Sequence, residues 1–274
     1  MIYKTLDIKN IIFPFLLFCI FKSSAQDSIV NYLDRKENKT KKSNAFFVET
    51  LVKKNDLWFH TLYHRNRKIK KRGQYLKKNK SLPIGNFYNF FRSGDLKRIY
   101  TYNDISQLDG YTKAWFPGNK LNYIGNYENG SKAGIWKYYH VNGKIACKQY
   151  FQNTKIIKTV VFDEDGIKIE KDLIESREPE FEGGGIDKFF KHIRRIHENI
   201  DFQINGIIYV NFDVNAEGVI NNVSIDDNIP IKLKRKLILY FESIEGWSPA
   251  IHMNRKIPYY FSLPLDFRVL IEER

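Results

Sequence analysis

Two series of glycines recur through the middle of the chain at nearly the same spacing. The members of the first series are Gly94, Gly118, Gly143 and Gly166. The members of the second are Gly85, Gly110 and Gly134. Successive glycines of the first series are 24, 25 and 23 residues apart, and the second series runs about nine residues ahead of it. Two series in phase indicate a repeat architecture, in which each unit buries its apolar side against its neighbours.

Each unit of this repeat predicts a β-hairpin. The clearest unit has an aromatic-rich strand from Gly134, an Asn142-Gly143 turn, and a second strand over residues 145–151. An Asn-Gly pair supplies the positive φ angles that a tight hairpin turn requires. Weaker copies cover residues 57–67, 85–94, 110–118 and 159–166. The sequence therefore predicts an all-β ladder of hairpins over residues 55–171, after an N-terminal segment of residues 26–54.

These units resemble MORN-type repeats, in the bacterial variant that is named for an antitoxin component. The shared pattern is Gly-x-aromatic, then Tyr-Tyr or Phe-Phe, then a Gly followed by Lys, Asp or Asn, and it extends over about residues 55–170. The resemblance implies an elongated sheet of stacked hairpins. The family name implies membrane contact, but a shared fold does not by itself establish a function.

From Pro179 onward the pattern changes to a mixture of helix and strand. The apolar positions of a first predicted helix are Ile186, Phe189, Phe190, Ile193, Ile196 and Ile200. Those of a second predicted helix are Leu233, Leu237, Phe241 and Ile244. Both sets have the three-to-four-residue spacing of one helix face.

The segments between and after these helices predict strands. Residues 208–214 alternate between apolar and polar side chains, and a turn follows at residues 215–218. On the returning strand, Val219, Val223 and Ile225 are predicted to share one face with Asn221. A long last strand over residues 257–267 completes the order α-β-β-α-β. The predicted fold class is therefore mixed: an all-β ladder followed by an α+β domain over residues 179–274, with helices packed on an antiparallel sheet.

Three ordered motifs make this region similar to TonB C-terminal domains as they occur in Bacteroidetes. They are Pro-Glu-Phe-Glu-Gly-Gly at residues 179–184, the hairpin Gly-Ile-Ile-Tyr-Val-Asn-Phe-Asp-Val with Gly-Val-Ile at residues 206–220, and Trp-Ser-Pro-Ala with Phe-Ser-Leu-Pro-Leu-Asp-Phe at residues 247–267. Two departures concern surfaces that could select a partner. The Tyr-Pro expected after the first helix is replaced by residues 200–202, and a basic segment at residues 231–236 replaces an acidic, Ala-rich one.

The resemblance also implies where a partner binds. Similar domains bind an extended receptor segment by adding it as a strand to an open sheet edge. Here the corresponding strand runs from Lys256 to Leu265, and Pro258 and Pro264 fit an edge better than a central strand because they have no N–H to donate. The candidate partner-binding residues are Lys256, Ile257, Tyr259, Tyr260, Phe261 and Leu263. The alternative is that this strand only closes the core, with Tyr260 as ordinary surface.

The positive charge of the chain is concentrated before residue 179. Residues 26–178 contain 30 Lys and Arg against 16 Asp and Glu, whereas residues 179–274 contain 12 against 14. The densest run, residues 64–80, could attract an anionic membrane or lipopolysaccharide surface. The sequence favours the alternative, a solvated strand edge, where lysines prevent aggregation. Nucleic-acid binding would require a cytosolic chain, which disagrees with the N-terminal pattern described next.

The first 25 residues have the pattern of a secretory signal peptide. Lys4 and Lys9 flank the start, an apolar run covers residues 11–21, and Ser23-Ser24-Ala25 precedes Gln26. An apolar run of this length is shorter than the ~20 residues that span a bilayer. We therefore expect export to the periplasm or outer membrane with cleavage near Ala25–Gln26, and an uncleaved membrane anchor is the alternative.

Cysteine usage agrees with a chain that has no disulfide. Cleavage after Ala25 removes Cys19 and leaves Cys147 as the only cysteine. Cys147 alternates with apolar neighbours, which predicts a buried strand thiol rather than a reactive one.

The sequence contains no recognisable catalytic or metal-binding pattern. His60 and His64 are four residues apart, but their surroundings predict a strand, where this spacing holds them apart. The other histidines lack ligand spacing to cysteines or carboxylates, and neither a phosphate-binding glycine loop nor a nucleophile elbow is present. We therefore expect neither an enzyme nor a bound metal or cofactor.

Two hypotheses follow from the sequence. The first is an extracytoplasmic protein–protein interaction protein of the TonB-like class, which binds an envelope or outer-membrane protein by strand addition and is linked to transmembrane transport. The alternative is a structural or surface-associating protein, whose basic repeats contact membrane or lipopolysaccharide. A classical energy transducer would need a membrane anchor and a Pro-rich spacer, whereas Pro contributes only 8 of 274 residues.

Overall fold

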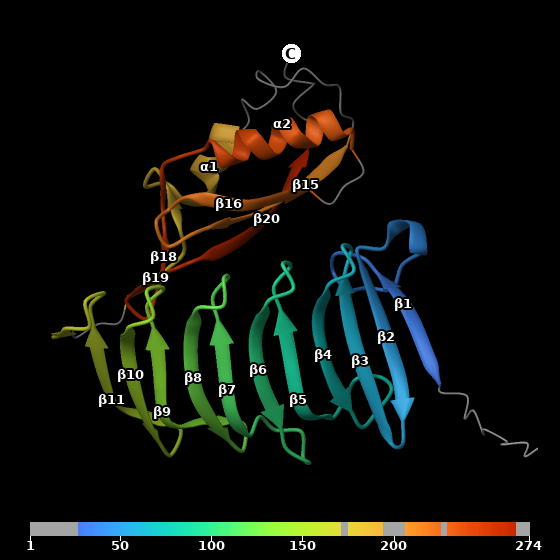
Figure 1. The fold of residues 1–274 in the computed structure, drawn as a ribbon, viewed down its shortest axis with the longest axis vertical. Helices are drawn as coiled ribbons and strands as arrows, with labels where there is room; N and C mark the ends of the chain where they lie inside the picture. Colours follow the sequence, from blue (N-terminus) through green and yellow to red (C-terminus); the bar gives the residue numbers. More distant parts are fainter. Residues whose placement is uncertain (1–26, 171–174, 194–205, 226–228, 267–274) are drawn as a thin grey trace, which may run out of the picture.

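The protein has two regions, a long β-ladder and a smaller C-terminal domain that lies above one rim of it (Figure 1). The computed structural model describes residues 27–170, 175–193, 206–225 and 229–266. The predicted signal peptide lies outside these residues. Within them, no helix has the length and hydropathy needed to cross a membrane.

The ladder is one antiparallel sheet of 12 strands that follow one another in chain order. The strands are β1 (Ser28–Leu33), β2 (Phe47–Lys54), β3 (Leu57–His64), β4 (Ile69–Tyr75), β5 (Pro83–Phe90), β6 (Leu96–Tyr102), β7 (Gly110–Trp115), β8 (Leu121–Glu128), β9 (Ser131–Tyr139), β10 (Ile145–Gln152), β11 (Lys155–Phe162) and β12 (Lys168–Ile169). A short 3-10 helix, η1 (Lys42–Asn44), lies between the first two strands. The predicted hairpins are present, and the same sheet also includes β1 and β2, which precede the predicted repeats.

One face of the ladder, called here the inner face, carries nearly all of its buried side chains. Strand geometry sends successive side chains to opposite faces. The buried inner-face side chains form three separate clusters, which are centred on Phe47, Phe87 and Trp136. Phe87 stacks on Tyr100 of the next strand with ring centroids 5.6 Å apart.

Two glycines outside the predicted series allow these rings to lie against the backbone. A Cβ on Gly125 would lie 2.2 Å from the ring of Trp136, and a Cβ on Gly73 would lie 2.2 Å from the ring of Phe87. No side chain fits at such a distance. The glycines therefore let the largest aromatic residues close the inner face.

The Asn142-Gly143 turn differs in detail from the prediction. Gly143 adopts a positive φ of 88°, but Asn142 does not. Instead, the Asn142 side chain accepts a hydrogen bond from the Lys144 N–H at 3.0 Å and donates one to the Glu164 carbonyl at 2.8 Å. The turn is therefore longer than a two-residue Asn-Gly turn. The Asn142 side chain bonds to the following turn on the same rim of the ladder.

The weakest predicted copy, residues 57–67, has the same pair of side-chain hydrogen bonds at its turn. Asn66 accepts from the Lys68 N–H at 3.1 Å and donates to the Arg92 carbonyl at 3.1 Å. Arg67 occupies the position that glycine takes in the other copies, and it adopts a positive φ of 65°. The copy therefore folds as a hairpin although it lacks the turn glycine.

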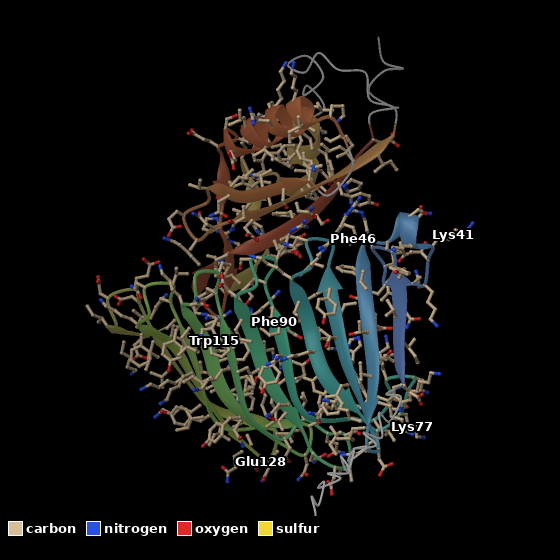
Figure 2. The ribbon with its side chains drawn as sticks, turned by 45° about the vertical axis from the view of Figure 1, so that its right-hand side comes forward. Lys41, Phe46, Lys77, Phe90, Trp115 and Glu128 are labelled. Atoms are coloured by element: carbon tan, nitrogen blue, oxygen red, sulfur yellow. The ribbon has the colours of Figure 1, made fainter. Side chains whose placement is uncertain are left out.

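The basic run over residues 64–80 is not a sheet edge, contrary to one of the two interpretations of the sequence. Strand β4 lies between β3 and β5, in the interior of the ladder. Lys71 lies 5.6 Å from the Phe87 ring centroid on the inner face, and Arg72 lies 4.5 Å from that of Tyr88. Lys77 is at the end of the ladder far from the C-terminal domain (Figure 2). The run is therefore distributed over the ladder rather than gathered in one patch.

The C-terminal domain contains the predicted order α-β-β-α-β, with additional short strands. Its elements are β13 (Ser176–Arg177), β14 (Glu180–Phe181), α1 (Gly185–Ile193), β15 (Ile207–Val214), β16 (Ile220–Ile225), α2 (Ile231–Glu242), β17 (Trp247–Ser248), β18 (Ala250–His252), β19 (Arg255–Ile257) and β20 (Tyr259–Asp266). The main sheet has the order β16-β15-β20. Both helices cover the face of this sheet that is turned away from the ladder (Figure 1).

The described residues of this domain form one hydrophobic core, which lies between these helices and the sheet. Phe189 of α1, Phe212 of β15 and Phe241 of α2 are at most 1% exposed. The rings of Phe189 and Trp247 are 4.8 Å apart. The predicted helix positions Ile196 and Ile200 lie outside the described residues.

Two strand predictions in this domain were wrong in detail. Ile220 is buried and Val219 is 53% exposed, because the strand register shifts near Asn221 and Asn222 adopts a positive φ of 54°. The last strand is also not continuous. Pro258 separates β19, which pairs with β18, from β20, which pairs with β15.

Candidate functional site

The candidate site is the outer edge of β20. This strand pairs with β15 along its whole length, from Tyr259 opposite Val214 to Asp266 opposite Ile207. In the described part of the chain, no strand pairs with its other side. β20 is therefore an edge strand, as the resemblance implied. Lys256 and Ile257 belong instead to β19, the edge of a different small sheet, so the predicted residues do not form one continuous edge.

The side chains of β20 are divided between the core and the opposite face. Phe261 stacks on Phe212 with ring centroids 5.2 Å apart, and Leu263 is buried. Tyr260 points away from the core and is 54% exposed. Tyr259 donates a hydrogen bond to the Glu178 carboxylate at 3.2 Å. Of the predicted residues on β20, Tyr260 is therefore the most accessible.

A buried asparagine holds the outward side chains of β20 in place. The Oδ1 atom of Asn211, on β15, accepts hydrogen bonds from the Tyr260 hydroxyl at 2.9 Å and the Ser262 hydroxyl at 2.8 Å. Its amide nitrogen donates to the Ser224 carbonyl of β16 at 3.2 Å. Asn211 is 1% exposed. It thus joins all three strands, a role that the alternating sequence pattern could not reveal because it predicted an outward polar residue.

The backbone of β20 is suited to an edge position. Pro264 lies opposite Tyr209 and has no N–H that could bond to β15. Residues that alternate with Pro264 along the strand, including Ser262 and Tyr260, are expected to direct their N–H groups in the same sense, away from β15. The free edge therefore offers main-chain donors and acceptors on both sides of a proline.

The polar face of this sheet lies toward the basic rim of the ladder. The Arg35 guanidinium, from the loop after β1, lies between two rings, 4.0 Å from the centroid of Phe46 and 3.9 Å from that of Tyr209. On the same sheet face, burial raises the pKa of the Asp213 carboxyl, while the Asn222 hydrogen bond and the positive charge of Lys97 oppose that rise. The ladder thus supplies cations to the surroundings of the candidate edge.

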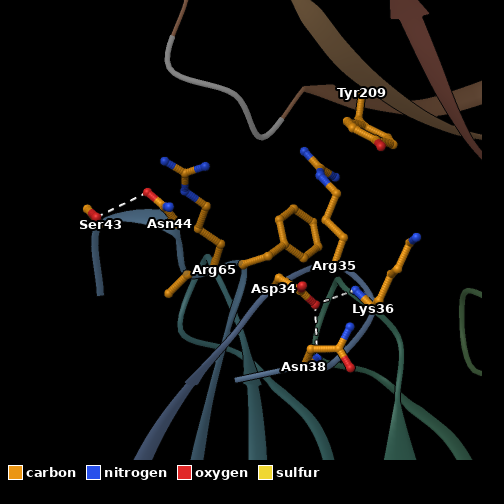
Figure 3. A pocket seen from close by; sticks show the side chains of 10 residues that line it. Asp34, Arg35, Lys36, Asn38, Ser43, Asn44, Arg65 and Tyr209 are labelled. Atoms are coloured by element: carbon orange, nitrogen blue, oxygen red, sulfur yellow. Dashed lines mark hydrogen bonds between the residues drawn. The ribbon is translucent and has the colours of Figure 1, made fainter. Parts of the chain in front are cut away.

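An open pocket of about 580 Å³ lies where the two regions meet (Figure 3). Arg35, Lys36 and Arg65 line it from the ladder, and Tyr209 lines it from the sheet. Asp34 also lines it, but one oxygen of its carboxylate already accepts the N–H groups of Lys36 and Asn38 at 2.8 and 2.9 Å. The pocket is therefore basic.

Arg255 fixes the C-terminal domain to the ladder, and sequence reasoning missed it. Its Nη1 donates to the Asn122 carbonyl at 3.0 Å, to the Asn122 side-chain oxygen at 2.8 Å and to the Tyr139 carbonyl at 2.8 Å. The residue is 1% exposed, and burial lowers the pKa of its guanidinium to about 10. An arginine in a short hairpin carries no sequence signal of such a role, because its acceptors lie more than a hundred residues earlier.

A second polar cluster that the sequence did not indicate lies on the inner face near β2. Glu49, which is 2% exposed, accepts hydrogen bonds from His60 at 3.0 Å, Lys80 at 2.6 Å and Asn31 at 2.8 Å. These bonds, led by that of His60, hold the pKa of Glu49 at about 2. These hydrogen bonds satisfy a buried carboxylate, so the cluster stabilises the fold.

Other candidate reactive groups have the environments expected of structural residues. Cys147 is fully buried, and burial raises the pKa of its thiol to about 11. The prediction of a buried strand thiol is confirmed. His64 lies four residues from His60 on β3, and burial lowers its pKa to about 4. Across the described ranges, no three His, Cys, Asp or Glu side chains gather as a metal site.

Comparison with known proteins adds no family or relative. No protein-family model matches the chain, and no curated protein sequence matches it. The similarity to TonB C-terminal domains and to MORN-type repeats therefore remains a prediction from the motifs.

Proposed function

We propose that this is an extracytoplasmic protein–protein interaction protein, whose C-terminal domain binds an extended segment of a cell-envelope partner as an additional strand beside β20. The observation that carries the proposal is the free edge of β20, which is paired on one side only over its eight described residues. An edge strand presents a row of unpaired N–H and C=O groups that another chain can take up. A partner in the outer membrane would link the protein to transmembrane transport.

The surroundings of the edge support this mode of binding. Asn211 holds Tyr260 and Ser262 in fixed positions, so the strand is ordered before a partner arrives. Arg255 holds the domain on the ladder, which keeps the edge in one position relative to the basic rim. Preorganisation of this kind lowers the entropic cost of association.

A proline substitution tests the proposal at a single N–H group. Ser262→Pro removes an N–H that points away from β15, and Ser262→Ala removes only the hydroxyl. We expect Ser262→Pro to weaken capture of the partner by about tenfold or more, which corresponds to ~1.4 kcal/mol, and Ser262→Ala to remain within about twofold. The measurement is quantitative pull-down from a solubilised envelope fraction, with circular dichroism to show that both variants fold. Equal capture by wild type and Ser262→Pro would overturn strand addition at β20.

The second candidate function is association of the basic ladder with an anionic surface, either membrane or lipopolysaccharide. The observation that favours it is the pocket lined by Arg35, Lys36 and Arg65. Each basic side chain near such a surface contributes up to ~1 kcal/mol of attraction. Co-sedimentation with anionic vesicles tests this function, and Arg65→Gln should reduce it without affecting capture through β20.

A further inference from the structure

Basic side chains lie on the inner face of the ladder and on the β18–β19 hairpin of the C-terminal domain, which packs against the Trp136 cluster of that face. Arg98 comes from β6 and Lys132 from β9, while His252 and Arg255 come from the hairpin. Met253, at the tip of the hairpin, packs against the aromatic cluster around Trp136. Side chains from both regions therefore meet around Trp136.

Arg98 lies among tyrosines instead of carboxylates. Its guanidinium carbon is 4.6 Å from the Tyr100 ring centroid, and its Nη2 is 3.5 Å from the Tyr127 hydroxyl. Its Nε atom is buried and has no hydrogen-bond partner within the part of the chain that the structure describes. A buried donor without an acceptor is unfavourable and calls for an explanation, which a bound anion would supply.

Lys132 is the second cation of this group. Its Nζ lies 4.2 Å from the Trp136 ring centroid and donates a hydrogen bond to the Tyr138 hydroxyl at 2.9 Å. Among the described residues, no acidic side chain forms an ion pair with either Lys132 or Arg98. The two charges are therefore balanced only by neutral hydroxyls and ring faces.

The electrostatics agree with this geometry. Burial lowers the pKa of Lys132, and the positive charge of Arg98 lowers it further. Burial also lowers the pKa of His252, with Arg255 and Lys132 as further causes. Neighbouring cations in a partly desolvated site repel one another, so the site attracts an anion strongly.

We infer that this part of the inner face binds an acidic sugar, with the anionic group between Arg98 and Lys132. A planar guanidinium matches the two oxygens of a carboxylate or phosphate. Tyr102, Tyr123 and Tyr127 pack against the Phe87 and Trp136 clusters and remain partly exposed, and tyrosines of this kind supply a sugar with apolar contact and hydrogen-bonding hydroxyls. The acidic group is either the carboxylate of a uronic acid or a phosphate ester, since both fit the same cations.

The test is isothermal titration calorimetry on the full chain. Tetragalacturonate is the carboxylate probe, glucose 1-phosphate is the phosphate-ester probe, and maltotetraose is the neutral sugar. We expect one acidic probe to bind, with an affinity that falls as salt rises, and maltotetraose to bind at least tenfold more weakly. Which acidic probe binds distinguishes the two sources of the anionic group.

Matched variants locate the site. Arg98→Gln and Lys132→Gln should each weaken binding of the acidic probe by about tenfold or more, whereas Arg98→Lys should retain part of it. Lys113→Gln is the control, because Lys113 is exposed on β7 between the inner-face residues Thr112 and Ala114 and so points to the opposite face. We expect this control to bind like wild type. Circular dichroism and thermal melting of each variant show that the ladder remains folded.

Several outcomes would overturn the inference. One is failure of both acidic probes to bind, and another is equal binding of maltotetraose. Equal binding of inorganic phosphate, or binding only to anionic vesicles, would exclude a sugar site. Loss of affinity in Lys113→Gln equal to that in Arg98→Gln would show a general charge effect rather than this site. Because capture through β20 does not involve Arg98, the Ser262 variants test the proposed function separately.

Discussion

The ladder and the C-terminal domain bury their apolar side chains in different ways. The ladder has three separate inner-face clusters along one sheet, whereas the C-terminal domain has one core between two helices and a sheet. In the ladder each unit depends on its neighbours, so damage should remain local. In the domain every element depends on the same core, so damage should spread through all of it.

The largest effect is expected in the core of the C-terminal domain. Phe241→Ala removes a fully buried ring that lies 5.6 Å from Phe212 and should destabilise the domain by ~3–5 kcal/mol. Hydrogen exchange should then show lost protection across β15, β16 and β20, while β2 to β10 keep theirs. Leu239→Ala, on the same helix but 59% exposed, is the control and should change little. Equal loss of protection in the ladder would show that the two regions unfold as one.

An acid-dependent loss of stability is expected at the N-terminal end of the ladder. The pKa of Glu49 in the folded chain is about 2, below its ordinary value of 4.5. The folded state therefore gains stability above pH ~4.5, and loses roughly 3 kcal/mol as pH falls toward 2. Hydrogen exchange of β2 and β3 at stepwise lower pH measures the loss.

A charge-removing pair of variants makes this test specific. Glu49→Gln should flatten the pH dependence of β2 and β3 below pH ~4.5, because the titrating group is gone. Glu37→Gln, which breaks the exposed contact with Lys70, should leave it unchanged. An unchanged slope in Glu49→Gln would assign the acid sensitivity to other carboxyls.

A smaller and more local effect is expected from the two close-packed glycines. Gly125→Ala places a methyl group against the Trp136 ring and should cost ~1–3 kcal/mol. Gly73→Ala does the same against Phe87. Protection should fall in β8 and β9 for the first variant and in β4 and β5 for the second. Loss of protection over the whole ladder in either variant would contradict the view of the ladder as a chain of neighbour contacts.

Patterning in the sequence was sufficient to predict both architectures. Glycine spacing and aromatic-rich strands predicted the hairpins, because both report on backbone geometry within one unit. Helical spacing of Leu233, Leu237 and Phe241 predicted the second helix and its buried face, and all three are at most 1% exposed. Such signals arise among residues a few positions apart, because the backbone geometry of one helix or hairpin determines them.

The strand predictions failed where a single residue shifted the register or interrupted a strand. The positive φ of Asn222 moved Ile220 into the core in place of Val219. Pro258 divided the predicted last strand, so Lys256 and Ile257 pair with β18 instead of lying on the edge with Tyr260. Alternation in sequence cannot reveal such shifts, because a one-residue change of register reverses every face after it.

The amino-acid sequence by itself determined the elements and their order: a repeating ladder of hairpins, then an α-β-β-α-β domain whose last strand suits an edge. Only the tertiary structure decided which charges meet. Arg255 reaches Asn122 and Tyr139 across more than a hundred residues, and Arg98 of β6 comes close enough to Lys132 of β9 that its charge lowers the pKa of that lysine. The physical reason is the distance along the sequence over which each kind of interaction acts. Backbone preferences act within a few residues, whereas a charge responds to every group that folding brings near it.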